Sequence, residues 1–421
     1  MGKRFHVANF IDSAWQETHC CNYLLATDLE MATPDGYAST SWKAGYGDYI
    51  MKPDLATLRV LPWLEKTALI LCDIQDHHTH ESVPFSPREI LKRQIERLDS
   101  HGYTAMMATE LEFFLFKESL ESLRRDQYMN LEPISGYNED YHILQTSKEE
   151  PVMQRLRNAL YAAGIPVENS KGEAEAGQEE LNIRYSDALA CADHHSIAKH
   201  ATKEIAWQQG HAATFLPKWH ADRVGSASHI HMSLWKEDKN VFHDTQGKHG
   251  MSDVMKHFMA GIIHYSPEYT VFLAPYVNSY KRFMKGTFAP TKTAWSVDNR
   301  TAGFRLCGED TAAVRVECRI PGSDVNPYLA QAALLAAGIK GIDSKMELAA
   351  AAGGDLYNDD SVAEIPSTLR EATTRLKVSN MLKEAMGEDV VAHYSRCAEW
   401  EQEEFDRAVT QWEVARGFER A

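Results

Sequence analysis

Four segments of the chain alternate charged with apolar residues at a period of two, which predicts β-strands with one polar and one buried face. In residues 109–116, Glu110 and Glu112 share one face. The other three segments are residues 177–185, 228–234 and 314–320, and their polar positions are Glu180, Asn182 and Arg184, then His229, His231 and Ser233, then Arg315, Glu317 and Arg319. The polar face of a single strand of this kind usually faces solvent and has no further function. Four of them predict a sheet whose polar face is a functional site.

Carboxylates dominate this polar face, and carboxylates gathered in a cleft must be neutralised by cations. Several carboxylates with few imidazoles suit Mg2+ or Mn2+, whereas Zn2+ favours more histidine or cysteine ligands. The spacing His229-x-His231 leaves a zinc site open as the weaker alternative. The pattern therefore favours Mg2+ or Mn2+.

Arginines supply positive charge near these strands. The set consists of Arg282, Arg300, Arg305, Arg315 and Arg319. Arginine binds carboxylate and phosphate groups through two parallel hydrogen bonds. Divalent ions combined with several arginines are typical of phosphoryl transfer. The sequence has neither a G-x-x-x-x-G-K-[ST] loop nor a protein-kinase signature, so a different fold must carry this chemistry.

The order of the segments predicts two domains. Residues 1–85 mix short apolar runs with turn-rich pieces such as Pro34-Asp35-Gly36, which indicates a small strand-rich domain. Ser86 and Pro87 then introduce a helix over residues 88–98, and we place the boundary there. Further helices are predicted over residues 151–163, 187–209, 252–273, 326–348, 368–386 and 390–416.

The charge balance limits the partners. The 421-residue chain has 60 Asp and Glu against 44 Lys and Arg, a formal net charge of −16. Such an acidic surface disfavours nucleic acid and anionic membranes. No apolar stretch reaches the roughly 18 residues of a membrane-spanning helix. Seven cysteines without C-x-x-C spacing fit free thiols, so we expect a cytoplasmic protein.

Six separated blocks, in this order, resemble the glutamine synthetase family over nearly the whole chain. They are Thr109-Glu110-Leu111-Glu112-Phe113; residues 173–180 with Ala176-Gly177-Gln178; Thr214-Phe215-Leu216-Pro217-Lys218; Gly225-x3-His229-x-His231-x-Ser233-Leu234; Asn278-Ser279-Tyr280-Lys281-Arg282 followed by Ala289-Pro290 and Asn299-Arg300; and Glu317-x-Arg319-x-Pro321 with Asn326-Pro327-Tyr328-Leu329-Ala330. Chance does not produce so many blocks in one order.

The resemblance implies an α+β fold with a β-grasp-like domain over residues 1–85 and a catalytic domain with a curved antiparallel sheet over residues 86–421. It also implies rings, as a dodecamer of two hexamers, with active sites between neighbouring subunits. Two or more Mg2+ or Mn2+ ions are expected. The first would be held by Glu112, Glu173 and Glu180, and the second by Glu110, His229 and Glu317.

The resemblance further implies roles in binding glutamate and ATP. Glutamate would be bound by Gly225 and by the catalytic residues Arg282, at the α-carboxylate, and Arg319, near the γ-carboxylate. Arg300, also catalytic, and Arg305 would contact phosphate, His231 and Ser233 would lie on the nucleotide side, and Phe215 would flank adenine or serve the core. In the implied reaction the γ-carboxylate attacks ATP to give γ-glutamyl phosphate, and a neutral amine then displaces phosphate.

The chain departs from the family at a flap segment, where ammonia-using members read G-x-E-A-P. Here the segment is Gly286-Thr287-Phe288-Ala289-Pro290. A phenylalanine accepts no proton, but its ring can contact an ammonium group and the carbon part of an alkylamine. The sequence therefore predicts a γ-glutamyl-amine ligase, similar to the methylamide, ethanolamide and polyamine synthetases of the family, and leaves the proton-accepting base open.

Alternatives stay open at this point. The chain could use ammonia as an ordinary glutamine synthetase, or bind amines or glutamate without catalysis as a sensor; transfer of phosphate to a guanidine fits the glutamate-binding block less well. Asp35 aligns with the family's ammonium-binding aspartate and is assigned a catalytic role, although a turn-forming Asp-Gly is the equal alternative. Tyr357 is only a faint match to the tyrosine that some members adenylylate, so we expect no such control.

Overall fold

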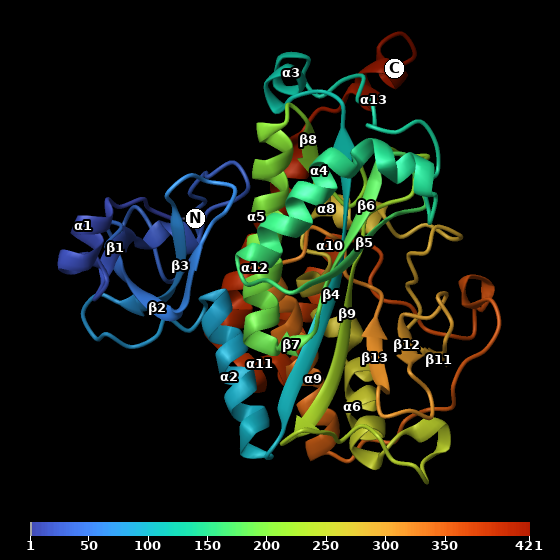
Figure 1. Ribbon diagram of the computed structural model, residues 1–421. Coiled ribbons are helices and arrows are strands. Elements are labelled where there is room, and N and C mark those ends of the chain that lie inside the picture. The colour runs from blue at the N-terminus through green and yellow to red at the C-terminus, as the bar shows by residue number, and fades with distance from the viewer. Residues whose placement is uncertain (1) are drawn as a thin grey trace.

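The computed structural model describes residues 2–421, which form two separate β-sheets (Figure 1). The smaller sheet is antiparallel and has the order β1-β2-β3, with the bounds Thr18–Cys21, Asp48–Val60 and Ala68–Asp76. The helix α2 (Pro87–Ser100) leads from it into the larger sheet. The N-terminal part is therefore strand-rich, as expected. The domain boundary at residues 85–86 stays a prediction.

The larger sheet has ten strands in the order β11-β12-β13-β9-β4-β6-β5, with β7 and β8 also paired with β4 and β10 with β9. Only β11 and β12 run parallel. The bounds are β4 Thr104–Phe116, β5 Val167–Gly172, β6 Gln178–Ile183, β7 Ser186–Asp187, β8 Ala212–Thr214, β9 Ser228–Lys236, β10 Lys239–Asn240, β11 Trp295–Val297, β12 Phe304–Cys307 and β13 Arg315–Cys318. The four strands predicted from alternation are consecutive neighbours, β13-β9-β4-β6. They therefore form one sheet with a polar and an apolar face, as predicted.

Most of the remaining helices belong to the larger domain, whereas α1 lies beside the smaller sheet (Figure 1). These helices are α1 Val7–Asn9, α3 Leu120–Arg125, α4 Ile143–Ala162, α5 Ala188–Gln208, α6 Asp253–His264, α7 Ser266–Leu273, α8 Val277–Lys281, α9 Pro327–Asp343, α10 Leu369–Val378, α11 Asn380–Met386, α12 Glu388–Arg407 and α13 Gln411–Gly417. Within the described residues, 2–421, none of them is long and apolar enough to cross a membrane.

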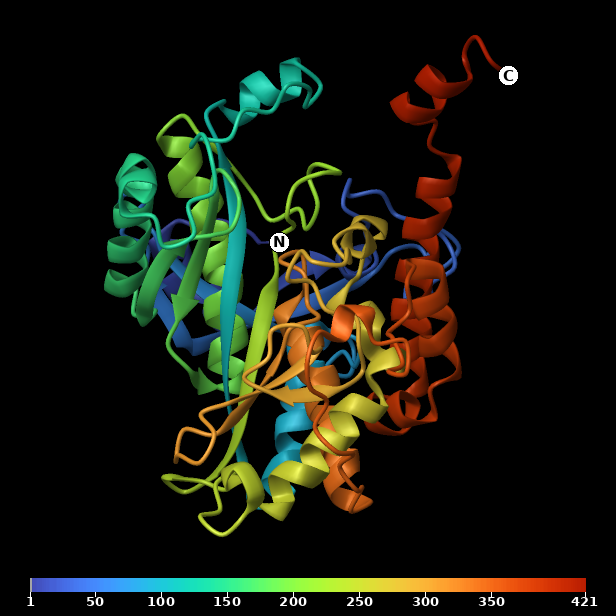
Figure 2. The same ribbon diagram turned by 90° about the vertical axis from the view of Figure 1, so that its right-hand side faces the viewer.

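The apolar side chains of the alternating strands form two cores. On β4 and β6, Leu111, Phe113 and Leu181 pack against α4 and α5, which lie together on one side of the long strand β4 (Figure 2). On β9 and β13, Met232 and Val316 pack against α2, α6 and α9. Because successive side chains of a strand point to opposite faces, the glutamates and histidines between these residues are left on the other face.

Three helices predicted as continuous are broken, at Pro267, Ser379 and Ala408. The segment 252–273 divides into α6 and α7, because Pro267 has no N–H to donate to the Ile263 carbonyl. The Ser266 hydroxyl donates to that carbonyl instead, at 2.8 Å. The segment 368–386 divides at Ser379, whose backbone is extended and whose side chain accepts from the Leu382 N–H to cap α11.

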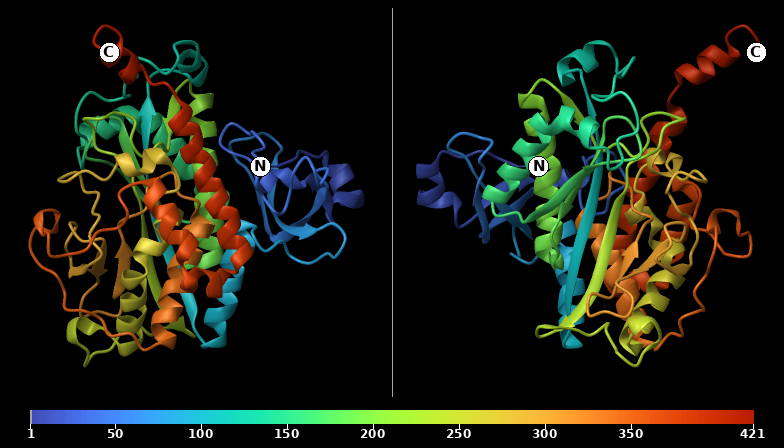
Figure 3. Two further views of the ribbon diagram at one scale, coloured as in Figure 1. Left: turned by 180° about the vertical axis from the view of Figure 1, so that it is seen from behind. Right: turned by 45° about the vertical axis from the view of Figure 1, so that its right-hand side comes forward.

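Two further helix limits differ from the prediction, in addition to the break at Ala408. The helix expected from Pro151 already begins at Ile143, where the His142 side chain caps it. The segment 326–348 stops as α9 at Asp343. The segment 390–416 divides at Ala408, whose backbone is extended, and α13 restarts with a capping box at Thr410. The C-terminal helix α13 projects away from the body of the molecule (Figures 2 and 3).

A buried arginine joins the smaller sheet to the helix α5 of the larger domain. Arg88, at the start of α2, donates to Asp54 of β2 at 2.8 Å and to Asp73 of β3 at 2.6 Å. It also donates twice to Asp193 of α5, at 3.1 and 3.0 Å. Ion pairs of this kind hold their partners in one geometry, because separating them leaves buried charges without a counter-charge. Arg88 therefore fixes the small sheet against the larger domain.

Candidate active site

The register of the larger sheet places the predicted polar residues on one continuous face. Glu110 of β4 lies opposite His229 of β9 on one side and opposite Asn182 of β6 on the other. Glu112 lies opposite Glu180 of β6, and Glu317 of β13 lies opposite His231. Directly opposed residues of antiparallel strands share a face. The site is therefore built by strand pairing from segments far apart in the sequence.

One group of possible metal ligands consists of Glu110, His229 and Glu317, whose ligand atoms lie within 4.8 Å of one another. The His229 Nδ1 atom is 2.8 Å from the Glu110 carboxylate and 3.6 Å from that of Glu317. The other ring nitrogen, Nε2, is buried and makes no hydrogen bond within the described residues. Two carboxylates with one imidazole fit Mg2+ or Mn2+, and this is the set expected for the second ion.

A second group, Glu112, Glu180 and His229, also has its ligand atoms within 4.8 Å of one another. The Glu112 carboxylate accepts from the Gln178 amide at 3.1 Å and from the Ala227 N–H at 2.7 Å. The Asn182 amide donates to Glu180 at 2.8 Å. These hydrogen bonds orient the carboxylates while leaving oxygen lone pairs for a cation. The two groups share His229, so they form one continuous site.

Glu173, the third ligand expected for the first ion, is not part of this group. Its carboxylate is ion-paired with Lys171 instead. The charge of Glu173 still raises the pKa of Glu112, so the two carboxylates lie close enough to interact. Lys171 sits on β5, next to the predicted strand, and nothing in the alternating pattern pointed to it.

The charges of the face are unevenly balanced. Burial would raise the pKa of Glu110, but hydrogen bonds from His229 and His231 outweigh it and lower that pKa. Burial would likewise raise the pKa of Glu317, and the charge of Arg319 is the main cause that lowers it instead. For Glu112 and Glu180 burial raises the pKa, and neighbouring carboxylates raise it further. Arg282 and Arg319 lower the pKa of Glu112 but do not outweigh burial and the neighbouring carboxylates, so a divalent cation would stabilise the Glu112–Glu180 half of the site.

Two of the predicted arginines point at the same carboxylate. Arg305 of β12 donates to Glu317 at 2.8 Å, and Arg319 is ion-paired with it from the end of β13. Arg319 is buried, and its Nε atom makes no hydrogen bond within the described residues. Arg300 is exposed on the loop before β12. The geometry thus brings Arg305 and Arg319 to the carboxylates, whereas Arg300 points to solvent.

A glycine, Gly225, allows the side chain of a third arginine, Arg282, to pack closely against the backbone beside the polar face. Arg282, just after α8, is 2% exposed and hydrogen-bonds the Ile320 carbonyl. A Cβ at Gly225 would lie 2.3 Å from the Pro217 carbonyl oxygen and 2.6 Å from the Arg282 side chain, so only glycine fits there. The Gly225 carbonyl also accepts from Gln178 at 3.1 Å. One tight backbone segment therefore positions both Arg282 and the amide that orients Glu112.

The nucleotide-side predictions have mixed outcomes. The His231 Nε2 atom is 2.8 Å from Glu110, so this residue is part of the polar face. Cys307 of β12, which no sequence pattern singled out, forms a further possible ligand group with His231 and Glu317. Ser233 lies two residues further along β9 and accepts from the Trp235 indole at 2.9 Å. Phe215 is 4% exposed and packs beside Phe113 in the α4–α5 core, and its contact with adenine stays a prediction.

Asp35 and Phe288 lie in loops, and within the described residues neither is joined to the carboxylates of the polar face by a hydrogen bond or ion pair. The Asp35 carbonyl accepts from Arg396 of α12 at 2.8 Å, so its loop packs against the helices of the larger domain. Phe288 is 54% exposed and has a left-handed backbone, with φ of 55°. Neither side chain contacts the polar face within this single chain. The exposed ring of Phe288 is available to a ligand.

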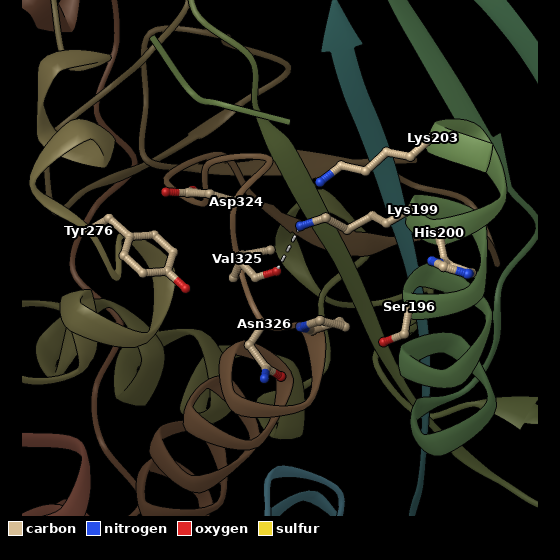
Figure 4. Close-up of a pocket in the computed structure, with 9 residues that line it drawn as sticks. Ser196, Lys199, His200, Lys203, Tyr276, Asp324, Val325 and Asn326 are labelled. Carbon is tan, nitrogen blue, oxygen red and sulfur yellow. Dashed lines mark hydrogen bonds between the residues drawn. The ribbon is translucent and has the colours of Figure 1, made fainter. Parts of the chain in front are cut away.

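A separate cavity of about 380 Å3 lies between α5 and the start of α9. Lys199 and Lys203 point into it from α5, towards the loop that carries Asp324 (Figure 4). The Lys199 ammonium group donates to the Ser323 carbonyl at 2.7 Å. None of the predicted site residues lines this cavity, so it is distinct from the polar face.

Comparisons with known proteins agree with this geometry. A family model described as glutamine synthetase, catalytic domain, matches residues 84–417. The chain is 46% identical to the γ-glutamylethanolamide synthetase GlnA4 of Streptomyces coelicolor, over all of this chain and 90% of that protein. It is 35% identical to the glutamate–isopropylamine ligase of a Pseudomonas species, over 99% of this chain and 91% of that one.

A solved structure, GmaS without ligand, superimposes with a TM-score of 0.84 at 25% identity and covers 98% of this chain and 92% of that one. The structure of GmaS with ADP matches with a TM-score of 0.80 at 27% identity, over 88% of this chain and 86% of that one. The mixed α+β architecture is therefore the glutamine synthetase fold. From the length of the family match and the identity to its members, the chain belongs to the glutamine synthetase family.

Proposed function

We propose that this protein uses ATP to join the γ-carboxylate of glutamate to a small amine, with release of ADP and phosphate. One observation carries the proposal: two groups of possible metal ligands, each with two glutamates, meet at His229. Such a site fits two adjacent Mg2+ or Mn2+ ions, with Arg305 and Arg319 at its edge. When bound, these ions would neutralise phosphate charge. Relatives named for amine ligation support the reaction class.

Each protein side chain then has a defined task. Arg282 would bind the α-carboxylate of glutamate and Arg319 the γ-carboxylate and the phosphate in transfer, because arginine matches both groups with paired hydrogen bonds. Arg300 and Arg305 would hold the ATP phosphates. Glu110, His229 and Glu317 would hold one ion, and Glu112, Glu180 and Glu173 the other. The last assignment requires Glu173 to leave Lys171, which it contacts here.

The amine is proposed to be an alkylamine rather than ammonia. Phe288 occupies the flap position at which ammonia-using members carry a glutamate, and its side chain is 54% exposed. An aromatic ring contacts the carbon part of an amine favourably, and its face attracts a cation without accepting a proton. The acceptor pocket would therefore select an amine by its apolar portion. The proton-accepting group is not assigned.

The deciding experiment measures amine-dependent phosphate release from glutamate and ATP. We expect methylamine, ethanolamine, putrescine or isopropylamine to give a higher kcat/KM than ammonia. Ammonia with the highest kcat/KM would show an ordinary glutamine synthetase. Binding of an amine with no phosphate release from any of them, under Mg2+ or Mn2+, would show a sensor without ligase activity.

A substitution at Phe288 tests the basis of this selectivity. We expect Phe288→Glu to raise the ratio of kcat/KM for ammonia to that for the best alkylamine by about ten- to a hundredfold. A carboxylate that hydrogen-bonds an ammonium contributes about 1.5–3 kcal/mol, and 1.36 kcal/mol is a factor of ten in rate. Phe288→Leu is the matched control, because it removes the ring without adding charge. An unchanged ratio in Phe288→Glu would rule out a role of this position in acceptor choice.

We also propose that the chain assembles with copies of itself into rings in the cytoplasm. The projecting C-terminal segment carries large apolar side chains with high exposure, Val409 at 78%, Trp412 at 66% and Phe418 at 84%. Such side chains are usually covered by a partner. A neighbouring subunit would also give Asp35, which lies apart from the site of its own chain, an active site to contribute to. Light scattering that shows a monomer at micromolar concentration would contradict this assembly.

A further inference from the structure

Three glutamates meet in the interior, away from the face that carries the candidate active site. Glu139 lies in the loop before α4, Glu149 on α4, and Glu179 on β6. Their side chains are 0%, 0% and 1% exposed, and their ligand atoms lie within 4.8 Å of one another. Fully buried glutamate is rare unless it has a counter-charge. This cluster therefore requires a physical explanation.

The positions of Glu149 and Glu179 are ones at which an apolar residue is expected. Glu149 precedes Val152, Met153 and Leu156 by three, four and seven residues, so it lies on the stripe of α4 that packs on the sheet. Glu179 shares the buried face of β6 with Leu181. Both carboxyls thus point into the contact between helix and sheet, where water is excluded.

The cluster has few hydrogen-bond donors. The Ser135 hydroxyl donates to Glu139 at 2.9 Å. Both oxygens of Glu149, one oxygen of Glu139 and one of Glu179 accept no hydrogen bond from an N–H or hydroxyl group within the described residues. Glu149 is the decisive case, because the side chain has no exposed surface and its two oxygens face only the other carboxyls of the cluster, with no N–H or hydroxyl donor within the described residues. A buried acceptor without a donor costs about 1–3 kcal/mol, and more if it is charged.

The nearby basic side chains are already paired elsewhere. Arg157 binds Ser170 at 2.8 Å and is ion-paired with Glu150. Lys148 donates to the Gln145 side chain. Lys171 is ion-paired with Glu173 and, at 3.1 Å, with Asp140. The charge of Arg157 partly offsets the burial that raises the pKa of Glu179, but within the described residues no basic side chain forms an ion pair with the three carboxylates. Burial together with Glu179 raises the pKa of Glu149 to about 9.

We propose that Glu139, Glu149 and Glu179 bind a structural divalent cation, distinct from the ions of the candidate active site. Calcium has oxygen ligands at about 2.3–2.6 Å, so two ligands on opposite sides of one ion are about 4.6–5.2 Å apart. Oxygens that all lie within 4.8 Å of one another fit around one such ion. An all-carboxylate set selects Ca2+, Mn2+ or Mg2+ over softer metals.

The cation would hold the segments behind the candidate active site in place. The Ser135 hydroxyl that donates to Glu139 also accepts from the Gly177 N–H at 2.6 Å. The Glu139 N–H donates to the Glu173 carbonyl at 3.3 Å. Glu179 is the neighbour of Glu180 in the same strand. One ion would therefore join the loop before α4, α4 itself and the segment that carries Glu173 and Glu180.

The test counts Mn2+ bound per chain by equilibrium dialysis of the metal-stripped full-length protein without ATP. Wild type is expected to bind one ion more than Glu149→Gln, because glutamine has the shape of glutamate but no charge. The double variant Glu110→Gln/Glu317→Gln, which removes candidate catalytic ligands, is expected to retain this ion. Adding Glu149→Gln to the double variant should abolish it. These counts do not depend on amine ligation, so they can fail while the proposed function holds.

The neighbouring substitution Glu150→Gln is the matched control and is expected to leave the count unchanged. If Glu149→Gln does not fold, Glu139→Gln makes the same test from the loop. Equal Mn2+ counts in wild type and folded Glu149→Gln or Glu139→Gln would overturn the proposal. They would show that bound protons neutralise the three carboxyls.

Discussion

The variant Glu110→Gln is expected to lose at least about a thousandfold in kcat for amine-dependent phosphate release. Glu110 is the central acceptor of the polar face, 2.8 Å from both His229 and His231. The change to glutamine keeps the shape but removes the negative charge that would bind a cation. Divalent ions contribute several kcal/mol to the stabilisation of transferring phosphate, and about 4 kcal/mol is a factor of about a thousand.

The loss should have the signature of a missing metal ligand. We expect the Mg2+ or Mn2+ concentration that gives half-maximal rate to rise, while circular dichroism and the melting temperature show an intact fold. Glu168→Gln, an exposed glutamate on β5 of the same sheet, is the matched control and should retain the wild-type rate. A kcat for Glu110→Gln within tenfold of wild type would exclude Glu110 as a metal ligand of the reaction.

The alternation of the four strands was sufficient to predict that each has a polar and a buried face, because successive side chains of a strand point to opposite faces. Their order as the neighbours β13, β9, β4 and β6 is set by tertiary packing and did not follow from the pattern. The divided helices were not predictable from apolar spacing, because apolar residues continue on both sides of Pro267 and Ser379. Local hydrogen bonding ends those helices, and periodicity does not record it.

The sequence predicted the polar face more completely than its surroundings. Glu110, His229 and Glu317 meet as expected, because each is on the polar face of a predicted strand. Cys307 was missed, since β12 has only four residues and no alternation to reveal it. The contact of Glu173 with Lys171 was missed because it depends on how a loop folds beside β5. Loop contacts depend on tertiary packing, which a linear pattern does not encode.

The variant Arg319→Lys is expected to lose about a hundred- to a thousandfold in kcat, with ATP binding nearly unchanged. Arg319 is 4% exposed and ion-paired with Glu317, and its Nε atom is free of hydrogen bonds within the described residues. Lysine keeps the buried charge, so the pair with Glu317 and the fold are preserved. It cannot reproduce the planar fork that holds a carboxylate and a developing phosphate together. Removing one such donor from a transition state costs about 100- to 1,000-fold in kcat.

The readouts separate a transition-state role from a structural one. If Arg319 acts on the group in transfer, kcat falls while the Kd for ATP and the melting temperature stay near wild type; Arg184→Lys, at an exposed position after β6, should change none of the three. A fall in melting temperature without a fall in the kcat of the folded enzyme would mean that Arg319 only neutralises Glu317. The distinction matters because Glu317 is both a candidate metal ligand and the partner of Arg305, so the same carboxylate would link a bound ion to the arginines. If the site transfers a phosphoryl group, the arginines must act on that group as well as neutralise Glu317. Arg319→Lys tests this requirement, because it retains the positive charge and removes only the planar guanidinium.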